Sequence, residues 1–413
     1  MALDTDGDFV VTWSGQDGGN RGVFGRLFDS SGSPVAGEFQ INTNTTGDQA
    51  YPRVAVAPGG SFVVVWRSKE NVYSASYGMV QRFDSAGSKL GVELKISAGT
   101  NQYYPAIDIV NSGEYVVVWA EIAATADVFG SRFDASGVQL ASEFQVNVVT
   151  ASTQAAAYPA IDGDGDFVVV WRSLGQDGDN GGIFVRRFAS SGQAVGGEIQ
   201  VNTYVTGNQL QGRIAMRSAG DFVVTWSSPR DGDTNGVFAR RFNASGAALG
   251  GEFQVNVHTL ASQTQGYPMM DQGGGFVAWH DNSGIDGQNF GVFARRFGST
   301  GIPQSPDFQV NTYTLGYQGS PAAAMIGSGN FVVAWKSIGQ DGDIDGIFAQ
   351  RFLLHTGPYD VDGNGISEPL TDGLVMLRYL FGFRGAVLIN GAVGAGCTRC
   401  DAPTIEAFIA ANV

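Results

Sequence analysis

A short run of oxygen-bearing side chains near the end of the chain is the clearest candidate for metal chemistry. Asp360, Asp362 and Asn364 alternate and a glycine follows them, which gives the hard donors and the sharp turn that a calcium loop needs. The backbone carbonyl of Ile366 and the carboxylate of Glu368 would extend this ligand set. The sequence therefore predicts a Ca²⁺ site. The alternative is an Asn/Gly turn whose acids cap a helix.

The closing ligand of this loop is displaced by one position. A calcium loop ends on an acid at its twelfth residue, but Thr371 stands there and Asp372 follows it. Either the loop carries one additional residue and Asp372 binds the ion, or Asp372 caps the next helix. Leu374, Leu377 and Phe381 then recur at helical spacing, so we expect a helix with these side chains on its apolar face.

The only cysteines of the chain, Cys397 and Cys400, form a Cys-x-x-Cys pair. The three histidines do not supply the spaced ligands that a structural zinc site needs, and no thioredoxin-like strand and helix surround the pair. We therefore expect a small local disulfide in an oxidising compartment, and keep two inert thiols as the alternative.

Charge narrows the range of partners. The formal net charge of −15 argues against nucleic acid and anionic membranes. No apolar run of about 18 residues predicts a membrane span, and the first residues carry no secretion signal. Many aspartates follow the second strand of a repeat, where we favour Asp/Gly turn chemistry over a face that binds calcium or sugars. These aspartates are Asp17, Asp177, Asp179, Asp231, Asp233, Asp286, Asp341, Asp343 and Asp345.

The elements that must position these residues repeat along most of the chain. All seven tryptophans close an apolar run of the type FVVVW, and they recur at intervals of 52 to 56 residues. Each repeat predicts four strands: a short apolar strand, the FVVVW strand, a VFxRRF strand and an EFQVNT strand. The tryptophans are Trp13, Trp66, Trp119, Trp171, Trp226, Trp279 and Trp335.

This pattern predicts an all-β, seven-bladed β-propeller over residues 1–352 and a small α-helical calcium-binding module over residues 353–413. A run that is apolar on both faces is typical of a central strand, and a closed ring of four-stranded antiparallel blades protects the sheet edges. A linear β-solenoid is the rival, but its coils are usually shorter than about 30 residues. We expect the tryptophans to be buried between blades, each contributing roughly 2–3 kcal/mol.

A second set of repeated residues is charged. The position before the last Phe of the third strand is Arg in six repeats, and the fourth strand begins with an acid in six. We expect cross-strand ion pairs within each blade, worth roughly 0.2–1 kcal/mol each, rather than a basic binding ring. The residues are Arg82, Arg132, Arg187, Arg241, Arg296 and Arg351, with Glu38, Glu93, Glu143, Glu198, Glu252 and Asp307.

The seventh repeat lacks an EFQVNT strand, since LLHTGPYDVDGNG follows Phe352. Its third strand is therefore predicted to have an open edge, which an N-terminal extension or a neighbouring molecule would cover. Donation of a strand between copies would be head-to-tail and would propagate as a filament. The predicted edge consists of Gly346, Ile347, Phe348, Ala349, Gln350, Arg351 and Phe352.

The segment DVDGNGISEPLTDGLVMLRYLFGFRG, together with CTRCDAPTIEAFI, resembles the dockerin-like EF-hand modules of secreted bacterial proteins. The repeats resemble the Gly- and Trp-rich propellers of large bacterial surface proteins. The resemblance implies Ca²⁺ on Asp360, Asp362, Asn364, Glu368 and Asp372, and an extracellular or cell-surface location. It implies no fixed activity.

The second half of the module departs from the dockerin pattern. If Asp401 matches Asp372, then Ile389, Gly391 and Val393 stand where the side-chain ligands of a second calcium site would be. The CTRC pair occupies that loop. We infer that a disulfide replaces the second metal as the clamp, worth roughly 2 kcal/mol in the chain-entropy model.

Near-identical blades, an open edge and a clamped module predict an extracellular structural or assembly protein, such as an adhesive or filament subunit. Its partners would be other copies of itself or cell-surface protein or glycan. The alternative is a glycan- or protein-binding module. An enzyme is not expected, because His258 and His280 are isolated variants within repeats and neither a nucleophile elbow nor HExxH occurs.

Overall fold

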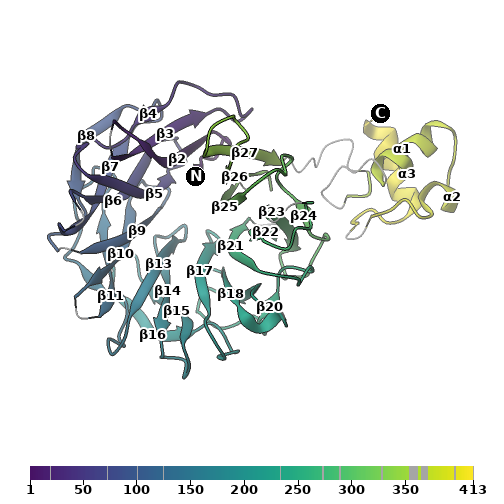
Figure 1. The fold of residues 1–413 in the computed structure, drawn as a ribbon. Coiled ribbons are helices and arrows are strands. Elements are labelled where there is room, and N and C mark those ends of the chain that lie inside the picture. Colours follow the sequence, from purple (N-terminus) through teal and green to yellow (C-terminus); the bar gives the residue numbers. More distant parts are fainter. Residues whose placement is uncertain are drawn as a thin grey trace.

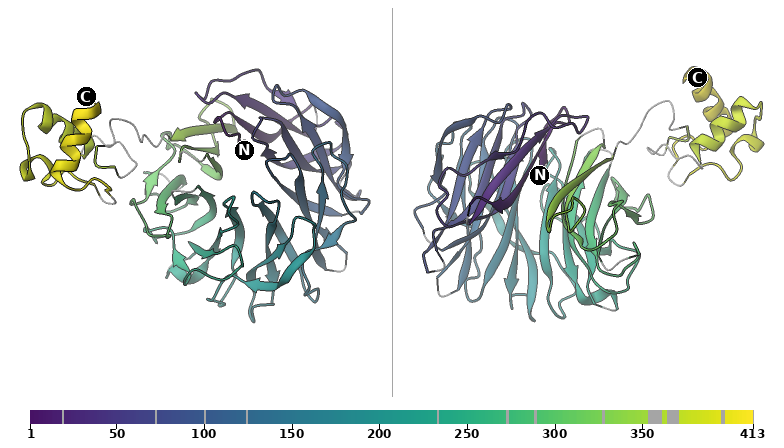
Figure 2. Two further views of the ribbon diagram at one scale, coloured as in Figure 1. Left: turned by 180° about the vertical axis from the view of Figure 1, so that it is seen from behind. Right: turned by 45° about the horizontal axis from the view of Figure 1, so that its top comes forward.

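The computed structural model confirms a seven-bladed β-propeller built from antiparallel sheets (Figure 1). Six blades have four strands in chain order, and the seventh has three within the part of the chain that the structure describes. Figure 2 shows the blades side by side around the axis of the ring. The structure describes residues 1–18, 20–71, 73–99, 101–123, 125–232, 234–271, 274–287, 290–326, 329–352, 361–363, 371–394 and 397–412.

The two inner strands of each blade carry most of the repeat's apolar side chains. The first strands surround the axis: β1 (Ala2–Leu3), β5 (Asp48–Val56), β9 (Gln102–Ile109), β13 (Gln154–Ile161), β17 (Leu210–Met216), β21 (Gln263–Met270) and β25 (Gln318–Met325). The second strands are the FVVVW runs: β2 (Phe9–Gln16), β6 (Phe62–Lys69), β10 (Tyr115–Ile122), β14 (Phe167–Leu174), β18 (Phe222–Ser228), β22 (Gly274–Asp281) and β26 (Phe331–Ser337).

The two outer strands follow in the same order. The third strands are β3 (Arg21–Phe28), β7 (Ser76–Phe83), β11 (Ala126–Phe133), β15 (Gly181–Phe188), β19 (Gly236–Phe242), β23 (Gly291–Gly298) and β27 (Gly346–Phe352). The fourth strands are β4 (Phe39–Gln40), β8 (Lys89–Lys95), β12 (Phe144–Gln145), β16 (Ala194–Gln200), β20 (Phe253–Gln254) and β24 (Phe308–Gln309). A short 3₁₀ turn, η1 (Pro229–Asp231), follows β18.

Each FVVVW strand is apolar throughout because its two faces pack on different blades. Val64 and Trp66 lie in a cluster with blade 1, whereas Val63 and Val65 lie in a cluster with blade 3. Alternate side chains of one strand therefore fill two interfaces. Six of the seven tryptophans are buried as predicted, and Trp13 is half-buried.

Four of the six fourth strands are only two residues long, shorter than the EFQVNT runs predicted. An asparagine side chain takes over the pairing: Asn42 Oδ1 accepts the backbone N–H of Val23 at 2.7 Å. The same bond recurs at Asn147, Asn202, Asn256 and Asn311. A side-chain acceptor satisfies the third strand as well as a ladder bond would, so the fourth strand can end early.

Among the described residues, the predicted ion pairs between the last arginine of the third strand and the acid that begins the fourth strand do not form, so this prediction is wrong; in blade 6 the preceding residue, Arg295, lies 3.8 Å from Asp307. The arginines reach forward: Arg187 Nη1 donates to the carbonyl oxygen of Ser245 in the next blade at 2.8 Å. The acids reach backward: Glu252 Oε2 accepts the N–H of Thr203 in the preceding blade at 2.8 Å. The outer turns of a neighbouring blade leave backbone groups free of the ladder, and charged side chains satisfy them. The forward bond recurs from Arg82 to Ala135, from Arg241 to Ser299 and from Arg351 to Ser31.

The first arginine of the VFxRRF motif also joins blades, in the opposite direction. Arg186 Nη1 donates to the carbonyl oxygen of Val146, in the fourth-strand segment of the preceding blade, at 2.9 Å. Arg240 and Arg295 make this backward bond and also bond to their own blades, whereas their equivalent in blade 1, Arg26, makes the own-blade bond alone, to Ala36 at 3.3 Å.

Blade 7 and blade 1 close the ring without sharing a strand. Phe9 and Val11 pack against Val332 and Ala334 across this boundary. Among the described residues β27 pairs only with β26, so the edge predicted at residues 346–352 is open there. Its coverage by another segment stays a prediction.

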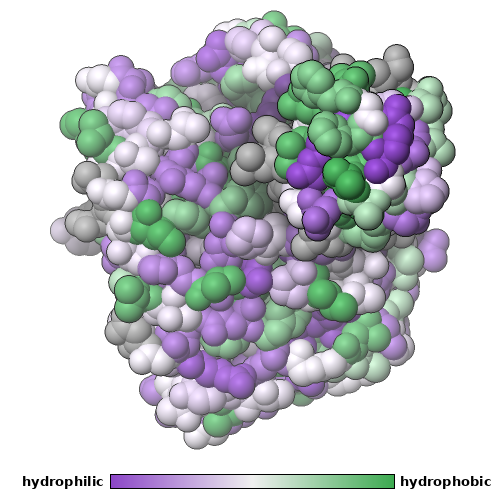
Figure 3. Space-filling view, turned by 90° about the vertical axis from the view of Figure 1, so that its right-hand side faces the viewer, coloured by the Kyte–Doolittle hydropathy of each residue, from purple (hydrophilic) through white to green (hydrophobic). Residues whose placement is uncertain are grey.

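The C-terminal residues form three helices, α1 (Asp372–Leu380), α2 (Ala386–Ile389) and α3 (Ala402–Asn412), around a small core of their own. The predicted apolar face of α1 is wrong, because Val375 is buried while Leu377 and Phe381 are 53% and 78% exposed. Figure 3 shows apolar and polar side chains mixed on the side of the molecule that carries these helices. None of the described helices is long and apolar enough to cross a bilayer.

Candidate functional site

Six first strands place one side chain each at the same height along the axis of the ring. In every case the strand register pairs this residue with the one that directly precedes the repeat tryptophan. Repeats that are otherwise alike differ most in chemistry at this ring of positions. The six residues are Arg53, Ala106, Tyr158, Arg213, Tyr267 and Ala322.

A β-bulge aims these side chains. The register of each first strand shifts just before the ring position, as between Ala50 and Arg53 in β5. In each of these strands a residue near the bulge has a left-handed backbone, with φ between 52° and 59°. Bulges re-aim side chains and are often found next to active sites. The left-handed residues are Tyr51, Tyr104, Ala156, Gln211, Gln265 and Ser320.

A cavity of about 300 Å³ lies on the axis, lined by the first strands. Its polar lining includes Arg53, Asp108, Tyr158, Arg213 and Tyr267. This volume is at the lower end of the range for small-ligand sites, so it would hold one or two sugar-sized groups. We call it the tunnel site.

Two arginines enclose Tyr158 in the tunnel site. The Arg213 guanidinium carbon lies 3.7 Å from the centroid of the Tyr158 ring, and that of Arg53 lies 5.8 Å from it. Arg53 Nη2 donates to Tyr158 Oη at 3.4 Å. None of the ion pairs formed among the described residues involves either arginine. The site therefore holds two arginines that form no ion pair with a carboxylate.

This charge changes how the groups ionise. Burial acts to raise the pKa of Tyr158, but Arg213 and Arg53 outweigh it and lower the pKa from 10.0 to about 8. Burial lowers the pKa of Arg213. For Arg53 burial acts in the same direction, but Tyr158 and Tyr267 outweigh it and raise the pKa. A phenolate at position 158 is thus accessible near neutral pH.

Asp108 is the acid of the tunnel site, two residues beyond the ring position of β9. Its Oδ2 accepts the N–H of Ile161 from the neighbouring blade at 2.8 Å, and its Oδ1 accepts the N–H of Ile109 at 3.0 Å. Burial raises the pKa of Asp108 from 3.8 to about 6, although both hydrogen bonds act to lower it. The tunnel therefore holds an acid and a phenol whose pKa values have moved toward neutrality.

The six predicted calcium ligands are only partly described. Asp360, Asn364, Ile366 and Glu368 lie outside the described residues. Asp362 and Asp372 are both buried. Asp372 Oδ1 accepts the N–H groups of Val361 and Asp362 at 2.7 and 3.0 Å, which ties the start of the loop to the start of α1. Calcium binding stays a prediction.

The predicted disulfide between Cys397 and Cys400 is confirmed, with Cα atoms 5.5 Å apart. The loop that it closes docks on the calcium-type loop. The carbonyl oxygen of Asp362 accepts the N–H groups of Thr398 and Arg399 at 3.1 and 2.8 Å. The two halves of the module are therefore joined through Asp362.

The acidic loops behave as turns where they are described. Asn202 Nδ2 donates to Asp177 Oδ2 at 2.9 Å, and the N–H of Gly207 donates to Asp179 Oδ2 at 2.6 Å. No group of three potential metal ligands occurs among the residues described. His280 is buried against Phe290 and Tyr317, outside the lining of the tunnel site.

A comparison of the residues that the repeats share did not reveal the tunnel residues. The signal lies in what they do not share: Arg53, Tyr158 and Arg213 each stand thirteen residues before a tryptophan, whereas Ala106 and Ala322 stand at the same distance in other repeats. Where a repeat has a polar residue at an axis-facing position that is alanine in other repeats, that residue indicates a functional site, because packing does not require it.

No protein-family profile and no curated protein matches the sequence. Solved structures match the fold. An ulvan lyase, described as a new family of polysaccharide lyase, aligns with 84% of this chain and 90% of its own at 11% identity and a TM-score of 0.55. The polysaccharide lyase Uly1 aligns with 85% and 90% at 11% identity and 0.53. The β-propeller domain of the Trilobed protease from Pyrococcus furiosus, with an open velcro topology, aligns with 85% and 92% at 8% identity and 0.50.

These likenesses correct the prediction that the chain is not an enzyme. The expectation relied on the absence of a nucleophile elbow and of HExxH, but a polysaccharide lyase needs neither motif. A puromycin hydrolase also shares the fold, at 12% identity and a TM-score of 0.51 over 86% of this chain and 52% of its own. Proteins with this fold thus include enzymes, and the absence of those two motifs does not argue against enzymatic activity.

Proposed function

We propose that this protein is a carbohydrate-active enzyme that cleaves an acidic polysaccharide by β-elimination in the tunnel site. The observation that carries the proposal is the arrangement of Arg53 and Arg213 around Tyr158. Two half-buried cations that form no ion pair with a carboxylate favour an anionic ligand. A phenol with a lowered pKa beside them supplies a base. A uronic acid residue offers both an anionic carboxylate and an acidic C–H bond next to it.

The chemistry follows from these groups. The arginines bind the sugar carboxylate and neutralise it, which acidifies the hydrogen on the adjacent carbon C5. The phenolate oxygen of Tyr158 removes that proton. The electron pair of the C–H bond forms a C4=C5 double bond, and the C4–O glycosidic bond breaks. The leaving oxygen takes a proton, either back from Tyr158 or from protonated Asp108, so that no oxidant or reductant is needed.

The comparison with lyases supports the substrate class. One structure of the ulvan lyase is described as bound to -[GlcA(1-4)Rha3S]-, which contains a uronic acid. The net charge of −15 does not oppose an acidic substrate at this place, because Arg53 and Arg213 make the lining of the tunnel locally positive.

The test is a screen of uronate-containing polysaccharides, ulvan among them, with the full chain. An elimination product absorbs ultraviolet light through its double bond conjugated to the carboxylate. Activity that Tyr158→Phe abolishes and Arg213→Met lowers at least a hundredfold would support the proposal. A folded protein that eliminates none of these polymers, or a Tyr158→Phe variant as active as the parent, would refute it.

A second candidate function is assembly, and the open edge of β27 favours it. Backbone groups on such an edge accept an added strand. We propose that a segment of another copy, or of a cell-surface partner, pairs with residues 346–352. The disulfide is consistent with an extracellular location. Light scattering over a range of concentrations tests this: an Ile347→Pro variant, which lacks an N–H on the outer edge, would contradict edge pairing if it associated as the parent does.

A further inference from the structure

The structure points to a second subsite outside the tunnel. We propose that Tyr51, Tyr104, Tyr103 and Arg67, named here the tyrosine platform, bind the next sugars of the same acidic polysaccharide while its end occupies the tunnel. This inference rests on the proposed function for its substrate, but it assigns a binding role to residues that the elimination chemistry does not use.

The platform consists of exposed aromatic rings at the entrance of two first strands. The rings of Tyr51 and Tyr104 meet edge to face with centroids 5.1 Å apart, and their side chains are 38% and 46% exposed. Tyr103 lies beside Tyr104, with ring centroids 6.2 Å apart. Tyr51 stands two residues before Arg53, so the platform continues toward the tunnel along β5. Flat rings of this kind stack on the apolar face of a sugar.

The fold does not need tyrosine at these positions. Each first strand has a left-handed residue at its bulge, and the other blades use Ala156, Gln211, Gln265 and Ser320 there. An L-residue with a large side chain gains nothing from this backbone conformation. Two adjacent blades nevertheless place a tyrosine at this position and leave it exposed. A binding role explains the two rings, whereas packing does not.

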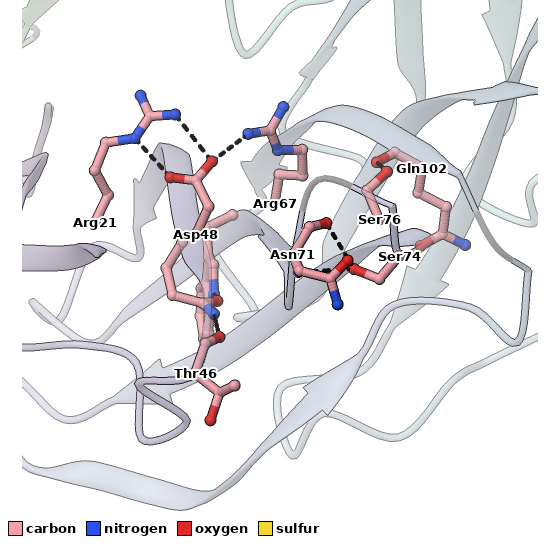
Figure 4. Close-up of polar contacts among 10 residues, drawn as sticks. Arg21, Thr46, Asp48, Arg67, Asn71, Ser74, Ser76 and Gln102 are labelled. Carbon is pink, nitrogen blue, oxygen red and sulfur yellow. Dashed lines mark hydrogen bonds and ion pairs between the residues drawn. The ribbon is translucent and has the colours of Figure 1, made fainter. Parts of the chain in front are cut away.

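The charge under the platform suits an anion. Asp48 accepts hydrogen bonds from two arginines, with Arg21 Nε at 2.6 Å from Oδ1 and Arg67 Nη2 at 2.6 Å from Oδ2 (Figure 4). The Arg67 guanidinium carbon also lies 4.8 Å from the centroid of the Tyr51 ring. One carboxylate thus holds two cations, which leaves a net positive charge beneath the exposed rings. An acidic sugar fits this surface better than a neutral one.

The experiment measures binding without turnover. Oligoglucuronates of two and four sugars, with and without sulfate, and neutral cello-oligosaccharides of the same lengths are titrated calorimetrically into the Tyr158→Phe protein. We expect the acidic tetramer to bind about tenfold more tightly than the dimer. The added substitutions Tyr51→Ala and Tyr104→Ala should remove that gain. Alanine is tolerated by this backbone, as Ala156 shows with φ 54°.

Tyr313→Ala is the control, since this tyrosine lies in the loop between β24 and β25, outside blades 2 and 3, and should leave the gain unchanged. If the platform variant keeps the tenfold gain while Arg213→Met weakens both oligomers, the platform is overturned and the tunnel site stands. If the neutral tetramer also binds more tightly than the neutral dimer, and the platform variant loses that difference to the same extent, the preference for an acidic ligand is overturned. If no acidic oligomer binds the folded protein at all, the platform and the proposed function both fail.

Discussion

Titration of Tyr158 is the most direct test of the tunnel site, because it needs no substrate. The pKa falls from 10.0 to about 8, so the arginines favour the phenolate by roughly 3 kcal/mol net of burial. The protein contains 13 tyrosines. We expect ultraviolet difference absorbance to show one phenol ionising near pH 8, well before the bulk of the others.

Two substitutions assign that transition. Tyr158→Phe should abolish it. Arg213→Met should move it above pH 10, because the nearer cation is lost while burial, which acts in the other direction, remains. A transition near pH 8 that survives Tyr158→Phe, or that Arg213→Met leaves in place, would refute the reasoning.

The same shift has a consequence for stability. The folded protein binds fewer protons than the unfolded chain between pH 8 and pH 10, so the free energy of unfolding should rise with pH across this window. The contribution is fully present above pH 10 and is lost as the pH falls through 8. Denaturant unfolding of the parent and of Tyr158→Phe at the two pH values measures it as a difference of roughly 3 kcal/mol.

Three further outcomes are expected. Asp108→Asn should flatten the pH dependence of the free energy of unfolding between about pH 4 and 6. The raised pKa of Asp108 stabilises the folded protein at low pH, and this stabilisation is lost as the pH rises through 6. An unchanged slope in urea unfolding would contradict this prediction. Arg351→Ala should lower the free energy of unfolding by about 1–2 kcal/mol because its bond to blade 1 is lost. Arg187→Ala removes the same kind of bond between blades 4 and 5 and serves as the comparison. An unchanged free energy of unfolding for Arg351→Ala would contradict the prediction. Asp362→Asn should weaken calcium binding measured calorimetrically at least tenfold, whereas Asp401→Asn should not; equal affinities would remove Asp362 from the ligand set.

The repeat made the fold predictable. A tryptophan every 52 to 56 residues fixed the number of blades, and the doubly apolar FVVVW run identified the central strand, because both properties depend on local pattern and burial. The disulfide was predictable from the Cys-x-x-Cys spacing together with the lack of further zinc ligands and of a thioredoxin-like context.

Contacts between blades were not predictable in the same way. The Arg187 side chain has an acid within reach on its own blade by sequence, yet it bonds to Ser245 in the next blade. Nothing in one repeat states how far a neighbouring blade's turn lies from it. The tunnel residues were hidden for a related reason: Tyr158 and Arg213 become neighbours only when the ring closes. In the nine-residue helix α1, Val375 packs in the core while Leu377 is exposed. The spacing of the apolar residues alone could not show which of them would be buried.

The boundary between blades 7 and 1 differs from three other boundaries in one respect that bears on how the molecule opens. The first arginine of the VFxRRF motif bonds to the preceding blade from Arg186, Arg240 and Arg295, whereas Arg26 bonds to its own blade alone among the described residues. Of the polar bonds that join neighbouring blades, the described residues retain the forward one, from Arg351, at this boundary. The interface between blades 7 and 1 is therefore held by fewer polar bonds. We expect these two blades to separate first when the propeller opens. Because the tunnel lies on the axis, such a motion would admit a polymer from the side, without threading its end through the ring.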